Sequence, residues 1–204
     1  MTGLWDEEGG WFSRLRREVD RYQLDNTLNR YQFYNCSISG DTSKGLRKRI
    51  GTELEARNHE KKKIITLISI GGKDALYLRD KERCRINIED FENNFREILE
   101  IAENISDQVV VISGKPMNWS KTDPCEWDDS IAYREKDIGR YGEVKKQICE
   151  EKGVPFIDLM SKIDQEEFSD KLEDGVHPNS EGHKLMKELI KPELQKLSII
   201  AGQI

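Results

Sequence analysis

Three short apolar segments, separated by long amphipathic stretches, constrain the fold of this chain more than any other feature. The segments are Lys63–Ile70, Gln108–Ser113 and Val154–Asp158, and β-branched residues dominate the first two. Continuous apolar runs of this length are typical of strands that are buried on both faces. Strands that alternate with long helices form βαβ units, so the pattern predicts a parallel sheet covered by helices.

The stretches around these segments carry apolar residues at helical spacing. Helices are predicted over about 11–22, 43–58, 88–104, 130–152 and 180–197. The β-prone segment Tyr31–Ile38 is expected to add a strand before the first long apolar run. We expect irregular structure over 114–129, which contains two prolines, and a connecting loop over the acidic stretch 164–170.

The length of 204 residues suits one domain with a substantial core, and no repeat or linker divides it. We therefore expect a single domain over 1–204. A net charge of -6 and a pI near 5.3 argue against a nucleic-acid surface, which would be basic. No apolar stretch reaches the ~20 residues of a membrane helix, and no signal-peptide pattern is present. A cytoplasmic location is the expectation.

The four cysteines, Cys36, Cys84, Cys125 and Cys149, are scattered without C-x-x-C spacing. This spacing argues against a zinc site and fits reduced thiols, although it does not exclude disulfides. No metal and no cofactor is implied by the sequence.

Polar turns follow the strands at three places along the chain. They are Ser39–Asp41, Gly71–Asp74 and the loop Asp174–Asn179. In open parallel sheets, ligands bind at the carboxyl ends of the strands, so these turns are expected to meet at one edge of the sheet. The sequence therefore predicts a functional site there.

The last of these loops combines an acid and a histidine in the pattern Asp174-Gly175-Val176-His177-Pro178. A histidine that acts as a general base needs an acceptor that orients its ring, and this spacing can supply both side chains from one turn. Gly175 permits the bend, and Ser180 is expected to cap the helix that follows. A surface histidine at a helix start is the alternative interpretation.

In chain order, these three turns resemble sequence blocks of the SGNH (GDSL-type) hydrolases, a family of esterases, thioesterases and lysophospholipases. The segment 35–43 is similar to the second block, Ile70–Asp74 to the third and Asp174–Asn179 to the fifth. The resemblance implies a flavodoxin-like, three-layer α/β/α fold. It also implies that His177 is the base, that Asp174 orients it, and that Gly40 and the residue at Lys73 contribute to the oxyanion hole.

Two departures from the family pattern bear on activity. The first block, a central strand ending in Gly-Asp-Ser, has no counterpart here, and Gly3–Trp11 resembles the family sequence just after that serine. We therefore expect that the first central strand and the nucleophile are missing and that the 204-residue chain is inactive. In addition, Lys73 replaces an oxyanion-binding asparagine, and losing one such donor typically costs ~100- to 1000-fold in rate. The alternative for Lys73 is a solvated side chain beside Asp74.

Three hypotheses remain open at this point. In the first, the protein is an ester or thioester hydrolase of small-molecule substrates whose nucleophilic strand lies upstream. In the second, it is a catalytically dead relative that binds a ligand or protein. In the third, it is an unproductive gene fragment. Trp119 and Trp127 are expected either to line the substrate side of the pocket or to form a packing cover. The acyl group, the alcohol and the oligomeric state are left undetermined by the sequence.

Overall fold

A computed structural model describes Gly3 and residues 6–26, 30–59 and 62–204. Its centre is a parallel sheet of three strands in the order β1 (Ile65–Ile68), β4 (Gln108–Ile112) and β6 (Phe156–Ile157). All three long apolar segments of the sequence therefore become neighbouring strands, and the predicted parallel sheet is confirmed.

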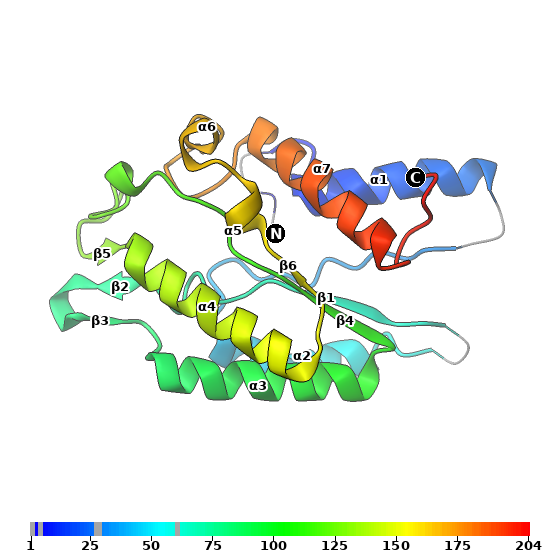
Figure 1. Cartoon of the computed structure of the whole chain (residues 1–204), viewed down its shortest axis with the longest axis horizontal. Helices are drawn as coiled ribbons and strands as arrows, with labels where there is room; N and C mark the ends of the chain where they lie inside the picture. The colour runs from blue at the N-terminus through cyan, green and yellow to red at the C-terminus, as the bar shows by residue number, and fades with distance from the viewer. Residues whose placement is uncertain (1–2, 4–5, 27–29, 60–61) are drawn as a thin grey trace.

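Helices cover both faces of this sheet (Figure 1). On one face lie α1 (Gly10–Asp25) and α7 (Ser180–Lys196), which pack against each other. On the other face lie α2 (Ser43–Glu55), α3 (Ile88–Ile105) and α4 (Glu135–Lys152). The predicted three-layer α/β/α arrangement is confirmed.

The central strand β4 divides the core into two halves. Val109 and Val111 pack into the cluster under α2, α3 and α4, whereas Val110 and Ile112 pack into the cluster under α1 and α7. Successive side chains of a strand point to opposite faces, so one apolar run serves both layers. This is the physical reason for the unbroken Val-Val-Val-Ile sequence.

Strand β1 is less well covered than β4. Only Ile68 of its four residues is buried, and β4 is the only strand that pairs with it within the described ranges. The segment 31–38, which the sequence predicts as a strand, has no strand hydrogen bonding here. A strand forms only where a partner satisfies its backbone, and β propensity does not report whether a partner is present.

A second, antiparallel sheet of very short strands extends from the first (Figure 1). Its order is β3 (Arg83–Cys84), β2 (Tyr77–Leu78) and β5 (Ile131–Ala132), and a 3-10 turn, η1 (Arg79–Lys81), joins β2 to β3. This sheet shortens the helix expected from residue 130, because 131–132 pair with β2 and α4 starts only at Glu135.

Two further differences concern segments expected to be irregular. The stretch 114–129 contains the 3-10 turn η2 (Trp119–Lys121). The acidic stretch 164–170 contains the helix α6 (Gln165–Ser169), which follows the short α5 (Leu159–Lys162). Asp164 caps α6 by accepting a hydrogen bond from the Glu167 N–H. An aspartate in this acidic stretch therefore begins a short helix where a loop was expected.

Candidate active site

His177 and Asp174 form a hydrogen-bonded pair on the loop between α6 and α7. The Asp174 Oδ2 lies 2.8 Å from the His177 Nδ1. An ionised carboxylate only accepts hydrogen bonds, so the contact places the proton on Nδ1 and the basic lone pair of the neutral ring on Nε2. The predicted acid–histidine contact is therefore present.

The other oxygen of Asp174 holds the loop itself. Asp174 Oδ1 accepts the backbone N–H groups of Val176 at 3.0 Å and His177 at 2.7 Å. Burial raises the pKa of Asp174, but the hydrogen bonds from His177 and Val176 outweigh this effect and lower it below its ordinary value. The carboxylate thus stays ionised over the pH range in which a histidine acts as a base.

Contacts with the segment after β4 fix the position of this loop. Gly175 adopts a left-handed backbone with φ 80°, and a Cβ added there would lie 2.9 Å from the Cβ of Lys121. The Gly175 carbonyl accepts the Asn118 N–H at 2.9 Å, and the Lys115 ammonium donates to the Val176 carbonyl. Burial lowers the pKa of Lys115 to about 7. The left-handed backbone of residue 175 and the lack of space for a Cβ beside Lys121 both favour glycine at this position.

The Gly40 turn and the Gly71–Asp74 turn are joined through a buried carboxylate. Asp74 is fully buried and accepts the Ser43 backbone N–H at 3.0 Å and the Ser43 hydroxyl at 2.5 Å. Asn94 of α3 donates to the same hydroxyl at 3.1 Å. Burial raises the pKa of Asp74 despite these bonds. This network ties the start of α2, three residues after Gly40, to the end of β1.

Gly40 lies in an exposed turn with a left-handed backbone. Its φ is 75°, the residue is exposed, and a Cβ added to it would meet nothing within 4 Å. The left-handed conformation, and not crowding, is the feature that favours glycine here.

Lys73 does not behave as a solvated side chain beside Asp74. Its Nζ lies 5.4 Å from the centre of the Tyr133 ring, and the residue is half-buried. Burial lowers the pKa of Lys73, the nearby Arg85 lowers it further, and Cys125 and Asp174 oppose the shift. The adjacent residues therefore point to different environments: Asp74 enters the core and Lys73 faces the aromatic ring, within electrostatic reach of Asp174.

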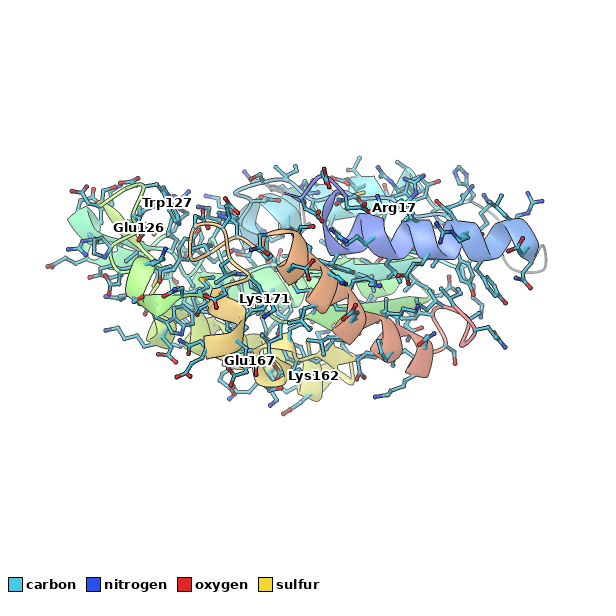
Figure 2. All side chains as sticks on the ribbon, turned by 90° about the horizontal axis from the view of Figure 1, so that it is seen from above. Arg17, Glu126, Trp127, Lys162, Glu167 and Lys171 are labelled. Atoms are coloured by element: carbon cyan, nitrogen blue, oxygen red, sulfur yellow. The ribbon has the colours of Figure 1, made fainter. Side chains whose placement is uncertain are left out.

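The two tryptophans occupy different places. The ring of Trp127 lies 6.3 Å from that of His177, centre to centre, and Trp127 is 46% exposed. Figure 2 shows it at the end of the molecule away from Arg17 of α1. Trp119 instead packs against the core cluster under α2, α3 and α4. Trp127 thus lies beside the histidine, whereas Trp119 makes the packing contacts that were the alternative expectation for both residues.

One set of contacts beside the histidine loop was not expected from the sequence. Arg14 of α1 binds the buried Asp6 carboxylate at 2.8 Å and also donates to the Ser180 hydroxyl at 2.6 Å. Ser180 is therefore not the cap of α7; Asn179 caps it by accepting the Gly182 N–H at 3.0 Å. Residues 4 and 5, within the stretch that resembles the sequence after the family serine, lie outside the described residues.

Other kinds of site find little support in the described part of the chain. Across residues 6–26, 30–59 and 62–204, no cluster of three or more His, Cys, Asp or Glu side chains is arranged to hold a metal ion. Within the same ranges, each helix is too short or too polar to cross a membrane.

Comparisons with known proteins agree with the fold. The model of the GDSL-like Lipase/Acylhydrolase family matches residues 2–185. The isoamyl acetate-hydrolyzing esterase 1 homolog of Homo sapiens is 18% identical across an alignment of 209 positions, which covers 96% of this chain and 78% of that protein. The acetyl xylan esterase AlAXEase has a TM-score of 0.73 at 14% identity, covering 95% of this chain and 93% of that chain. A catalytic mutant of the acetylxylan esterase Axe2 from Geobacillus stearothermophilus has a TM-score of 0.68 at 19% identity, covering 91% and 80%.

Proposed function

The chain belongs to the GDSL-like lipase/acylhydrolase family, and we propose that its site hydrolyses small carboxylic esters with His177 as the base. The observation that carries this proposal is the 2.8 Å contact between His177 Nδ1 and Asp174 Oδ2, on a loop braced by Lys115 and Asn118. A merely structural surface histidine would not need this bracing. The names of the relatives, an isoamyl acetate-hydrolyzing esterase and acetyl xylan esterases, favour acetyl esters as the first substrates to test.

In this mechanism His177 Nε2 removes the proton from a serine hydroxyl, and the serine oxygen attacks the ester carbonyl. The C–O bond to the alcohol breaks, and the alcohol leaves with the proton that His177 holds. Water, deprotonated by the same nitrogen, then attacks the acyl carbon; the bond to the serine oxygen breaks, His177 returns the proton to that oxygen, and the acid is released. Asp174 keeps the ring in the required tautomer and stabilises the imidazolium that forms in each half of the reaction.

The oxyanion is proposed to bind the Gly40 N–H, whose turn the Ser43–Asp74 contact holds in place. Lys73 stands where the family carries an asparagine. Its half-buried ammonium can stabilise negative charge, but the flexible side chain is less preorganised than an amide. We therefore expect Lys73 to support a lower rate than asparagine would.

The serine is proposed to come from a further strand that pairs with the open edge of β1. Two features of the structure support this. The first three residues of β1 are only half-buried, and β4 is the sole strand paired with it in the described ranges. The segment 31–38 lies outside any strand ladder. We propose that a strand inserted between them would satisfy both backbones and carry its carboxyl end toward the Gly40 turn and the His177 loop.

The test is to fuse a strand ending in Gly-Asp-Ser to this chain and to measure p-nitrophenyl acetate hydrolysis. A Gly-Asp-Ala fusion is the matched control, and His177→Ala in the serine fusion tests the base. We expect turnover in the serine fusion alone. Equal rates in the serine and alanine fusions, or full activity with His177→Ala, would contradict the proposal.

The 204-residue chain without such a strand is proposed to have little activity, because removing one member of a triad forfeits most of the rate. Incubation with a fluorophosphonate should leave it unlabelled by intact-mass analysis. Stoichiometric labelling of one serine would show that the nucleophile is already present. If the serine fusion is folded and inactive on all esters tested, the second candidate, a ligand-binding relative in which Lys73 replaces the oxyanion donor, becomes the better description.

A further inference from the structure

A pocket lies on the α4 side of the sheet, beside the segment after β4 that contacts the histidine loop through Lys115 and Asn118. Its volume is about 310 Å³, within the lower range of small-molecule sites, which is roughly 300–1,000 Å³. Gly114 and Met117 line this pocket, whereas the intervening Lys115 points away and donates to the Val176 carbonyl. Gly71 and Gly72, in the turn after β1, line it, whereas His177, Asp174, Gly40 and Lys73 do not.

Three glycines line one side of this pocket. Gly139 and Gly142 lie three residues apart on α4, and Gly72 follows β1. A Cβ added at any of these positions would meet nothing within 4 Å. Gly72 and Gly139 are exposed and Gly142 is partly buried, so this side of the pocket opens toward solvent.

The pocket contains a buried ammonium group with few partners. Lys145 is only 4% exposed and lines the pocket, and its Nζ donates to the Ile70 carbonyl at 2.9 Å. Within the described residues, no carboxylate lies within 4.0 Å of this nitrogen. An ammonium has three N–H donors, and a buried charge is normally paired. Lys145 therefore has unused capacity to bind an anion.

The remaining walls define which anion fits. Met117, Ile138, Phe156 and Met160 line the pocket and provide apolar surface around the ammonium. Three other charged side chains also line the pocket: Lys146 lies 4.0 Å from the partly buried Asp158, and Glu143 is exposed. A carboxylate with a short hydrocarbon chain matches the buried ammonium and the apolar wall beside it.

We propose that this pocket is a binding site for a short-chain monocarboxylate, with its carboxylate on Lys145 and its hydrocarbon chain against Met117, Phe156 and Met160. The ligand supplies the ion pair that the buried ammonium lacks. The site does not depend on the proposed ester hydrolysis, although an acid released by that reaction has the same chemistry as the ligand.

The experiment is calorimetric titration of the chain with hexanoate, with hexanamide as the uncharged probe of the same shape. We expect hexanoate to bind and hexanamide to bind at least about 10-fold more weakly, because a hydrogen bond to a charged group is lost. Lys145→Met should weaken hexanoate binding by about 10- to 100-fold, while Lys146→Met at the rim should change it by less than about 3-fold.

A second variant tests the pocket without removing the charge. Gly142→Leu places a side chain at the partly buried wall of the pocket and should weaken hexanoate binding by at least about 10-fold, while circular dichroism reports that the fold persists. His177→Ala should bind hexanoate as the parent chain does, which separates this site from the catalytic one. The proposal is overturned if hexanoate produces no heat up to its solubility limit, if Lys145→Met binds it equally well, or if only His177→Ala weakens binding.

Discussion

The buried ammonium of Lys145 makes a quantitative prediction about stability. Burial lowers the pKa of Lys145 from 10.5 to about 8, and each pKa unit corresponds to about 1.4 kcal/mol. The fold therefore disfavours the charged form by about 3 kcal/mol. Replacing Lys145 by methionine removes this cost and keeps an apolar side chain of similar length, at the loss of one hydrogen bond to the Ile70 carbonyl, worth about 1 kcal/mol. Near pH 7, Lys145→Met should be more stable by about 2 kcal/mol.

The pH dependence provides the sharper test. The folded-state pKa lies below the unfolded value, so between about pH 8 and pH 10.5 the unfolded chain binds more protons than the folded chain. The free energy of unfolding of the parent chain should therefore rise across this window relative to that of Lys145→Met. The cost is fully present below about pH 8 and is lost as pH rises toward 10.5, so the difference should change from about 2 kcal/mol in favour of Lys145→Met to about 1 kcal/mol in favour of the parent chain.

Urea unfolding followed by circular dichroism near pH 7, pH 9 and pH 10 measures this difference. Lys146→Met is the matched control, because the neighbouring lysine is 43% exposed and its contribution should stay nearly constant. A stability difference between the parent chain and Lys145→Met that is the same at all three pH values would refute the reasoning, as would marked destabilisation near pH 7.

Three further predictions concern the proposed catalytic site and its supports. In an active, serine-containing form, Asp174→Asn should lower kcat by about 1,000-fold or more with little change in unfolding free energy, which steady-state kinetics and urea unfolding would measure together. Arg14→Met should destabilise the fold by about 2–3 kcal/mol, because it leaves the buried Asp6 carboxylate without its cation; Arg16→Met, on the exposed face of α1, should cost less than about 0.5 kcal/mol in the same melts. Gly175→Ala should cost about 1–3 kcal/mol, since φ is 80° and the new Cβ lacks space; an unchanged midpoint would contradict that geometry.

The elements that the sequence predicted well are those with strong periodicity or composition. Strand β4 follows from an unbroken run of valine and isoleucine, and α3 follows from Phe91, Phe95 and Ile98 on one stripe. The two-residue strands of the second sheet carry no periodicity, so they could not be predicted. The segment 31–38 has strand composition, but its state depends on a partner that the segment itself does not specify.

The candidate site divides in the same way. Asp174 and His177 are three residues apart, so their contact could be expected from local spacing alone. The contacts of Asp74 with Ser43 and of Arg14 with Ser180 join residues 31 and 166 positions apart. No local pattern specifies such pairs, because they depend on how the helices pack on the sheet. The burial of Lys145 could not be predicted for the same reason, because no local pattern distinguishes it from the many lysines that the fold leaves at the surface.

The contrast between Lys73 and Asp74 has a consequence for how this site can change over time. Asp74 anchors the turn after β1 through its contacts with Ser43, and it does so without involving its neighbour. Lys73 faces the other way, over the Tyr133 ring. Mutation can therefore alter the chemistry at residue 73 while the backbone that presents it stays in place. An asparagine, a lysine or another polar residue at this position should therefore change the stability of the fold little, so the proposed active site can vary there while its backbone is kept.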